Sequence, residues 1–367
     1  MSSKNGSSSL NGTKMSVPFS DNVPLSSLDK VIPLSVVLGV LFLVSVIGNA
    51  LVCIVIIKRK DMRGVTNLLL FNMALSDLLS TVFFVPWAIA KEISPMSWPL
   101  GDFMCRAPPV ISSVSVSVSV YSMLALAVER YQAVVSPFNF RASRDSHRRA
   151  FLLMIGIWLV GCAIATPQAV VITTLEIPPV TYCLEDWSGS GGEDGNRAYI
   201  VVIFVVLFAI PLVVICGSYS VIMRKLWQPD NFMATQSKSQ DIRFEEQGSP
   251  NKLKIHGANM KRKTTYMLIT VIVVFIICML PFQILVLVAH FRLDLVRSKA
   301  FFISAKVAVV LATCSMASNP FIYSFFSEKF RRAFADVFKC RCDDDGQLES
   351  TQRKSSVVLL SSTTLPK

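Results

Sequence analysis

The sequence predicts an all-α membrane protein: a bundle of seven transmembrane helices followed by a short amphipathic eighth helix on the inner leaflet. Of the 367 residues, 52% are hydrophobic and only 16% are charged, and the mean hydropathy is +0.54. Soluble chains carry about 25% charged residues. In addition, seven apolar runs reach the roughly 20 residues that a helix needs to cross a bilayer. Within a bundle spanning 31–325, they cover about residues 32–57, 66–90, 105–135, 151–173, 198–223, 264–290 and 300–325.

The third and seventh runs need a separate argument. In the third run, Val and Ser alternate from Val114 to Val120 with the period of two that is typical of a strand. An open strand in lipid leaves its backbone groups unpaired, however, and a Ser hydroxyl can bond to its own preceding turn. We therefore predict a helix. The seventh run contains Lys306 and Asn319, but its length and the amphipathic segment after it favour a span.

Residues 1–30 are predicted to form an extracellular, glycosylated tail. They begin with a polar stretch that contains two N-glycosylation acceptors, Asn5 in Asn-Gly-Ser and Asn11 in Asn-Gly-Thr. We find no cleavable signal peptide, so the first helix is expected to insert as its own signal. Seven spans then place the C-terminus in the cytoplasm of a multi-pass plasma membrane protein.

The loop charges support this orientation, because Lys and Arg accumulate on the cytoplasmic side of membrane proteins. The predicted outer loop 174–197 is acidic and contains Arg197 as its basic residue. A net charge of +12 can indicate nucleic-acid binding, but here the topology accounts for most of it, and we expect no nucleic-acid partner. The basic residues of the predicted inner loops are Lys58, Arg59, Lys60, Arg63, Arg141, Arg144, Arg148, Arg149, Arg224, Lys225, Lys261, Arg262 and Lys263.

The segment 326–342 is predicted to be an amphipathic helix with an acylation site. Phenylalanine recurs every four residues with basic residues between, a pattern that suits an anionic inner leaflet. Cys340 and Cys342 follow, as sites of palmitoylation or, alternatively, as two free cytosolic thiols. Residues 343–367 are predicted to be a disordered cytoplasmic tail whose Ser and Thr residues suit phosphorylation. The phenylalanines are Phe326, Phe330, Phe334 and Phe338.

One disulfide bond is predicted from the positions of the cysteines. Arg130 follows Cys105 by 25 residues, so a straight helix separates them by roughly 37 Å and puts Cys105 at the outer, oxidising rim. Cys183 is the plausible outer partner. The other cysteines fall within spans or in the cytoplasm: Cys53, Cys162, Cys216, Cys278, Cys314, Cys340 and Cys342.

Asp77 lies near the midpoint of the second span, where an ionisable residue is costly and indicates function. Neutral oxygens at a similar depth could surround it, so the site suits a small hard cation or a proton. The alternative is a protonated Asp that only joins helices. Its possible partners are Asn49, Ser119, Ser315 and Asn319.

The sequence contains no group of residues that is typical of an enzyme active site. Its three histidines, His147, His256 and His290, lie in different loops, so neither a metal cluster nor a nucleophile paired with His is indicated. The glycine-rich 189–195 segment lacks the Lys-Ser/Thr of a phosphate-binding loop and is interpreted as a flexible loop. A transporter or channel is the alternative from another class, but the chain has no internal repeat.

Taken in order, the motifs resemble those of a rhodopsin-like (class A) G-protein-coupled receptor over about residues 30–342. Each occurs in its own span, which makes the whole set far more specific than any single member. The matching residues are Gly48-Asn49, Leu75-Ser76-Asp77, Glu129-Arg130-Tyr131, Trp158, Pro211, Tyr219, Cys278-Met279-Leu280-Pro281 and Asn319-Pro320-Phe321-Ile322-Tyr323.

The resemblance implies a switching mechanism. Arg130, held by Glu129 at rest, is expected to turn toward Tyr219 and Tyr323 as the sixth span moves and opens a cleft for a heterotrimeric G-protein. The third inner loop, about 225–262, does not indicate the G-protein class. Arrestin and receptor kinases are expected at the tail. Pro211, Pro281 and Pro320 each remove a helix hydrogen bond and can supply kinks.

The family also implies an allosteric sodium ion and no other cofactor. The ion would stabilise the inactive state, with Asp77, Ser119, Ser315 and Asn319 as its ligands. One departure is Met279, which stands where the family usually has Trp. Its effect on activation is left open, because Met is flexible and polarizable.

The class of ligand is indicated by particular positions in the third and seventh spans and by three longer segments. An amine receptor needs Asp where this chain has Ser112, and an opsin needs Lys where it has Thr313, although Lys306 lies nearby. The segments TYCLEDW at 181–187, MRGVTNLLLFNMALSDLL at 62–79 and SVSVYSMLALAVERYQAVVSPF at 115–138 look like those of the neuropeptide FF, RFamide and neuropeptide Y receptors.

That likeness implies an RFamide-like amidated peptide, whose basic Arg would be attracted by the acidic pair Glu185 and Asp186. The alternative for this pair is a solvated acidic loop. Ser112 stands where the closest peptide receptors tend to have Gln, so the exact subtype stays open. The expected pocket lining is Ser112, Val116, Phe282, Gln283, Val286 and His290.

Overall fold

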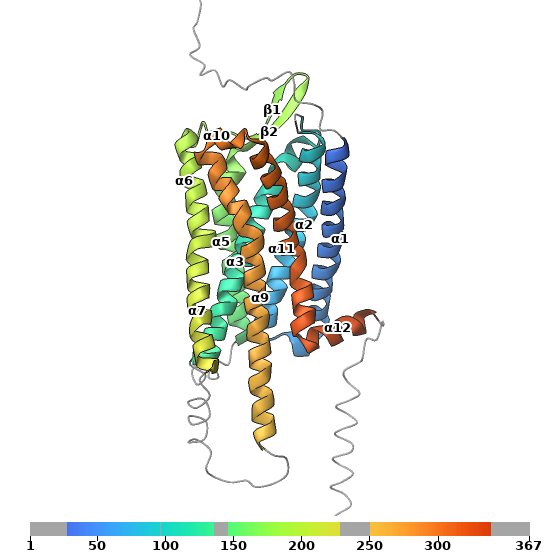
Figure 1. Cartoon of the computed structure of the whole chain (residues 1–367), viewed down its shortest axis with the longest axis vertical. Coiled ribbons are helices and arrows are strands. Elements are labelled where there is room, and N and C mark those ends of the chain that lie inside the picture. The colour runs from blue at the N-terminus through green and yellow to red at the C-terminus, as the bar shows by residue number, and fades with distance from the viewer. Residues whose placement is uncertain (1–27, 96, 136–145, 228–249, 339–367) are drawn as a thin grey trace, which may run out of the picture.

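The computed structural model describes residues 28–95, 97–135, 146–227 and 250–338, which form a seven-helix bundle (Figure 1). A β-hairpin lies at one end, here named the hairpin end. A short helix turns sideways at the other, named the α12 end. The helices are α1 (Leu28–Lys58), α2 (Val65–Ile93), α3 (Gly101–Val135), α5 (Ser146–Val171), α6 (Gly192–Phe204), α7 (Ile210–Trp227), α9 (Pro250–Phe291), α10 (Leu293–Val296), α11 (Lys299–Phe326) and α12 (Glu328–Phe338), with a 3-10 turn η1 (Lys60–Met62) and a π-helical turn η2 (Val205–Ala209).

Within the part of the chain that the structure describes, seven helical stretches are long and apolar enough to cross a membrane, which confirms the predicted spans. The run of alternating Val and Ser is indeed helical and belongs to α3. Ser117 donates a hydrogen bond to the carbonyl of Ser113 at 2.8 Å, the bond to the preceding turn that lets Ser enter an apolar helix. Large apolar side chains such as Val40, Leu43 and Ile47 face outward from α1 and suit contact with lipid.

The hairpin is the part of the fold that the all-α prediction did not contain. Strands β1 (Ile172–Ile177) and β2 (Val180–Glu185) pair antiparallel, with Thr174 opposite Cys183. The backbone N–H of Trp98 donates to the carbonyl of Thr181 at 2.7 Å. Besides the hydrogen bonds between its own strands, the hairpin therefore has one to the segment between α2 and α3.

Two segments predicted as loops are partly helical. The flexible loop predicted at 189–195 is a tight turn in which Gly192 donates to the carbonyl of Trp187 at 2.9 Å, and α6 begins at Gly192. The segment predicted as the third inner loop, about 225–262, includes the first turns of α9, which begins at Pro250 and extends past the other helices (Figure 1). Hydropathy marks where a helix leaves the membrane, whereas its hydrogen bonds continue into polar sequence.

Helix α12 packs against the bundle through its phenylalanines. Phe330 is 2% exposed and its ring lies 5.6 Å from that of Tyr323 and 5.9 Å from that of Phe334, measured between centroids. Arg59, just after α1, forms an ion pair with Asp336. The predicted amphipathic helix is confirmed, and its apolar face also completes the core of the α12 end. The side chain of Phe338 lies outside the described residues.

Helices α1 and α11 approach closely at Gly48. A Cβ atom on Gly48 would lie 2.8 Å from Cγ of Pro320, closer than such atoms normally come. We expect Gly48→Ala to lower the free energy of unfolding by about 1–3 kcal/mol, measured by thermal unfolding of the purified protein. The matched control is Gly39→Ala in the same helix, where nothing lies within 4 Å. Equal stability of the two variants would contradict the close packing.

Candidate functional site

The centre of the bundle contains a buried carboxylate. Asp77 is 6% exposed. Its Oδ2 accepts a hydrogen bond from Nδ2 of Asn319 at 2.8 Å, and its Oδ1 accepts one from the Ser119 hydroxyl at 3.2 Å. Ser119 also bonds to Ser76 at 2.9 Å. Three of the four predicted sodium-site residues therefore meet at one point, contributed by α2, α3 and α11.

A small cavity adjoins Asp77, and Ser315, the fourth predicted ligand, lines it together with Met279. It has about 20 Å³ of space for the centre of a water-sized sphere, enough for about one small ion or water molecule. Carboxylate, hydroxyl and amide oxygens suit a hard cation. The hydroxyl of Ser115 also faces this cavity and has no partner among the described residues. The donor set thus fits a sodium ion.

Asn49 supplies a hydrogen-bond donor that α11 lacks at Pro320. Proline has no N–H, so the carbonyl four residues earlier, that of Met316, lacks its helical donor. The Nδ2 of Asn49 donates to that carbonyl at 2.9 Å and to the carbonyl of Ser45 at 3.0 Å. The close approach at Gly48 brings Asn49 within reach. This contact connects α1 to the segment of α11 that carries Asn319.

At the α12 end, Arg130 is held in a three-residue polar cluster. Its Nε lies 3.0 Å from Oε2 of Glu129, and the two side chains are 20% and 14% exposed. Its Nη2 donates to the hydroxyl of Thr66 on α2, and that hydroxyl lies 3.3 Å from both carboxylate oxygens of Glu129. The predicted Glu129–Arg130 contact is present. Thr66 was missed, because a Thr at a helix start carries no functional signal.

Two buried tyrosines lie on the helices facing this cluster. Tyr219 on α7 and Tyr323 on α11 are 6% and 0% exposed. Neither hydroxyl has a hydrogen-bond partner within the described part of the chain. Tyr219 is within electrostatic range of Arg130. Tyr131 is 36% exposed and points away from the core. An unpaired buried hydroxyl is costly, so this end holds polar groups that another arrangement could pair.

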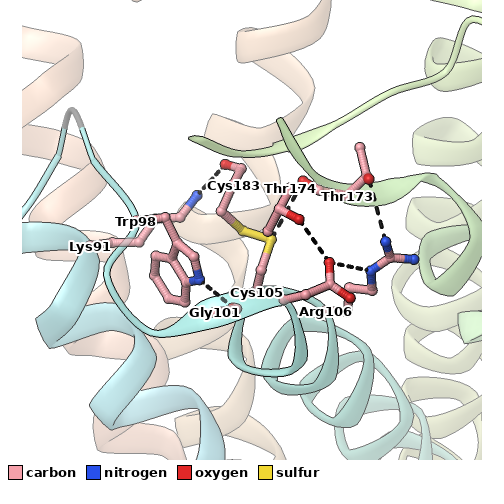
Figure 2. The surroundings of a disulfide bond; sticks show 9 residues. Lys91, Trp98, Gly101, Cys105, Arg106, Thr173, Thr174 and Cys183 are labelled. Atoms are coloured by element: carbon pink, nitrogen blue, oxygen red, sulfur yellow. Dashed lines mark hydrogen bonds and ion pairs between the residues drawn. A yellow bond between two sulfur atoms is a disulfide. The ribbon is translucent and has the colours of Figure 1, made fainter. Parts of the chain in front are cut away.

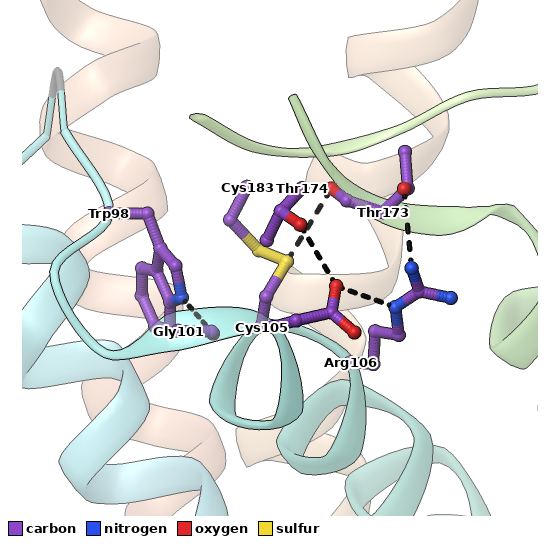
Figure 3. A network of polar contacts seen from close by, with 8 residues as sticks. Trp98, Gly101, Cys105, Arg106, Thr173, Thr174 and Cys183 are labelled. Carbon is purple, nitrogen blue, oxygen red and sulfur yellow. Dashed lines mark hydrogen bonds and ion pairs between the residues drawn. A yellow bond between two sulfur atoms is a disulfide. The ribbon is translucent and has the colours of Figure 1, made fainter. Parts of the chain in front are cut away.

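The hairpin end is joined to α3 by the predicted disulfide, Cys105–Cys183, which is present and closes 78 residues (Figure 2). Cys105 is fully buried. Asp102 accepts hydrogen bonds from Arg106 and Thr174, each at 2.9 Å. These polar contacts place β1 beside the bridge on top of α3 (Figure 3).

The chain was then compared with known proteins. A family model described as "7 transmembrane receptor (rhodopsin family)" matches residues 48–323. This chain is a seven-transmembrane receptor of the rhodopsin family. The neuropeptide FF receptor 2 of Rattus norvegicus is 31% identical over 315 residues, covering 82% of this chain and 70% of the relative.

Two further relatives are similar to this receptor over the same share of its length, 82%. The QRFP-like peptide receptor of Branchiostoma floridae is 27% identical over 310 residues and is 76% covered. The substance-K receptor of Rattus norvegicus is 32% identical over 306 residues and is 72% covered. The relatives are named for different ligands, so overall identity does not select one of them.

The acidic pair that the sequence predicts as a ligand contact lies at the hairpin end of the receptor. Oε2 of Glu185 accepts a hydrogen bond from the indole N–H of Trp187 at 3.1 Å. Oδ1 of Asp186 accepts one from the backbone N–H of Ser188 at 2.9 Å. That bond, together with the Ser188 hydroxyl, lowers the pKa of Asp186 below its ordinary value. Both carboxylates are exposed, so solvent screens them.

The residues of the predicted pocket lining come from α3 and α9. Ser112 bonds to Ser80 at 3.3 Å, and Val116 lies deeper, on the cavity beside Asp77. Nδ1 of His290 lies 2.7 Å from the carbonyl of Val286 in its own helix, and the His290 carbonyl accepts a bond from Arg197 at 3.2 Å. Phe282, Gln283 and Val286 are half-buried on α9.

Several predicted features lie outside the described residues. The side chains of His147 and His256 are among them. The others are the glycosylation sites Asn5 and Asn11, the acylation sites Cys340 and Cys342, and the phosphorylation sites of the tail.

Proposed function

We propose that this receptor binds an extracellular neuropeptide, an amidated RFamide-like peptide, at its hairpin end and activates a heterotrimeric G-protein at its α12 end. In this proposal the hairpin end faces outside at the plasma membrane, with the N-terminus extracellular and the C-terminus cytoplasmic. A disulfide at the hairpin end supports that orientation, because disulfides persist in oxidising compartments.

The observation that carries the peptide proposal is the acidic pair at the end of β2. Glu185 and Asp186 follow the bridged Cys183 directly. The bridge fixes their position over α3, and they are exposed to solvent. Exposed carboxylates at the mouth of a bundle attract a cationic ligand during its approach. Two relatives are named for neuropeptide FF and for a QRFP-like peptide, which supports the same ligand class.

The signalling proposal rests on the two ends of the bundle being linked by packed helices. Ligand binding can shift a two-state balance only if it favours one state. At rest, Arg130 is paired with Glu129 and Thr66, while the hydroxyls of Tyr219 and Tyr323 lack partners among the described residues. In the active state Arg130 turns toward these tyrosines. Pro281 and Pro320 lie inside α9 and α11, where each removes one helix hydrogen bond and so permits the movement.

A sodium ion is proposed at Asp77, with Ser119, Ser315 and Asn319 as further ligands, where it stabilises the inactive state. Sodium is then expected to lower agonist affinity by about fivefold or more, measured by peptide displacement in sodium chloride against N-methylglucamine chloride. Asp77→Asn is expected to abolish this difference. The control is Asp102→Asn, a carboxylate on α3 that is exposed. An unchanged sodium effect in Asp77→Asn would contradict the proposed site.

The remaining partners concern segments outside the described residues. We include glycosylation of Asn5 and Asn11, palmitoylation of Cys340 and Cys342, and binding of arrestin and receptor kinases to the tail. Membrane lipids are the expected partners of the exposed apolar helix faces and of α12.

The ligand proposal is tested with cells that express the receptor and a panel of amidated peptides with Arg or Ala before the last residue. Calcium and cyclic-AMP responses are both recorded, because the G-protein class is open. The Arg peptides are expected to be about tenfold or more as potent as the Ala peptides, because an ion pair is lost in the latter. Equal potency would contradict the acidic recognition of the ligand.

A further inference from the structure

A second acidic group lies deeper at the hairpin end. Glu92, the penultimate residue of α2, forms an ion pair with Lys306 of α11. The two side chains are 19% and 23% exposed, close to the values of the Glu129–Arg130 pair and below the 33% and 30% of Arg59 and Asp336. A charge pair this far from water is costly to form. At the mouth of a helix bundle, such a pair indicates function.

The surroundings of the pair suit a cationic ligand with an aromatic neighbour. The ammonium of Lys306 also lies 4.6 Å from the ring centroid of Phe302, so it keeps an attractive partner if it leaves Glu92. On the adjacent position of α2, the ammonium of Lys91 lies 4.9 Å from the centroid of the Trp87 ring. The same ammonium donates to the carbonyl of Cys183 at 3.4 Å (Figure 2). Each of the two lysines thus has an aromatic ring beside its ammonium group, and Lys306 has the Glu92 carboxylate as well.

Glu92 is a better discriminating group than the exposed acidic pair. Glu185 and Asp186 are exposed, and exposed ion pairs contribute little because solvent and salt screen them. A largely buried carboxylate is screened less. Lysine meets a carboxylate as a point charge, whereas arginine can form two parallel hydrogen bonds with it. An incoming guanidinium can thus displace Lys306.

We propose that Glu92 binds the guanidinium of the ligand's arginine, and that Lys306 occupies Glu92 until the ligand arrives. The proposal rests on the receptor function proposed above and identifies the group that recognises the cation. Glu185 and Asp186 then attract the peptide, and Glu92 distinguishes it. Neutralising Glu92 is then expected to lower the potency of a peptide that contains Arg, and neutralising Lys306 is expected to raise it. The two changes would not have opposite effects if the pair were purely structural.

The test uses the full-length receptor in cells and two peptides, one ending in Arg-Phe-amide and one with citrulline, a neutral analogue of similar shape, in place of Arg. The unmodified receptor is expected to prefer the Arg peptide by about 30-fold. Glu92→Gln is expected to reduce this preference to about threefold or less. Lys306→Gln is expected to make the Arg peptide about threefold to tenfold more potent, because its competitor is gone, and to leave the citrulline peptide unchanged.

Three controls accompany these variants. Surface labelling of an N-terminal epitope reports folding. Glu92→Asp keeps the carboxylate and is expected to retain most of the preference. Glu176→Gln, which neutralises an exposed carboxylate of β1 with no assigned role in binding, is expected to change the preference by less than about threefold. If either single variant fails to reach the surface, the double variant Glu92→Gln with Lys306→Gln, which buries no charge, must show the lost preference.

The outcomes separate the two proposals. A receptor that responds to the Arg peptide but keeps its preference in Glu92→Gln, or in the double variant, overturns the role of Glu92 and leaves the ligand class intact. Equal losses for both peptides in Glu92→Gln and Lys306→Gln also overturn it, because that result describes a structural pair. A receptor that responds to neither peptide overturns the ligand class and this inference together.

Discussion

Arg130→Ala is expected to reduce agonist-stimulated nucleotide exchange on the G-protein by at least about tenfold while the receptor still reaches the cell surface and binds its ligand. Arg130 lies at the α12 end, and 25 residues separate it from the disulfide at the hairpin end, a helix length of roughly 37 Å. The change removes the group that pairs with Glu129 and Thr66 at rest. The variant therefore has no guanidinium that can turn toward Tyr219 and Tyr323.

Two variants make this experiment specific. Arg106→Ala removes an arginine from the same helix, but one that is 44% exposed and paired with Asp102 at the hairpin end, so exchange should persist. Arg130→Lys keeps the charge and loses the planar fork, so an intermediate loss is expected. The measurement is nucleotide exchange in membranes, with ligand displacement on the same preparation. Full exchange in Arg130→Ala would contradict the proposed switch.

Cys105→Ser is expected to destabilise the receptor by at least about 2 kcal/mol and to weaken peptide binding by about tenfold or more. The bridge closes 78 residues, and its loss frees the whole hairpin at the mouth of the bundle, including but not limited to the exposed carboxylates of Glu185 and Asp186. The remaining ties to the bundle include the bond between Thr174 and Asp102 at 2.9 Å and that between Trp98 and Thr181 at 2.7 Å. The first is exposed, so it replaces little of the constraint.

Replacing either cysteine of the Cys105–Cys183 bridge should have the same effect as replacing both. Cys105→Ser, Cys183→Ser and the double variant should lose the same stability, because each removes the same bond and interacting sites are not additive. Cys162→Ser and Cys216→Ser, at two exposed free cysteines, should leave stability and binding unchanged. Thermal unfolding of purified receptor and peptide displacement measure both effects. Additive losses, or a loss in the Cys162→Ser control, would contradict this interpretation.

Most of the fold could be predicted before the structure was considered. The seven predicted spans agree with the seven apolar helices among the described residues, although α3, where alternating Val and Ser imitate a strand, needed an argument beyond hydropathy. The argument that succeeded there was a general one, since lipid does not tolerate an open strand. The same rule does not apply to the segment after α5. The β1–β2 hairpin formed there lies at the end of the bundle, beyond the spans (Figure 1).

The candidate sites divide in the same way. Asp77 and Arg130 could be selected from the sequence, since a charge in an apolar run is conspicuous. Thr66, which bonds to Arg130, and Ser115, which lines the cavity beside Asp77, could not, because Ser and Thr are common in membrane helices and only the facing helix shows which ones matter. Lys306 was noticed as a polar residue of its span, but Glu92 was not recognised as its partner.

The order of apolar and polar residues along the chain determines how many helices cross the membrane, because hydrophobicity is a sum over about 20 neighbouring residues. The cysteine positions likewise determine the Cys105–Cys183 bridge. The tertiary structure decides which polar groups meet: Asp77 with Asn319, 242 residues apart, and Glu92 with Lys306, 214 residues apart. These contacts depend on how each helix is rotated and packed, a property of the whole bundle that no single span contains.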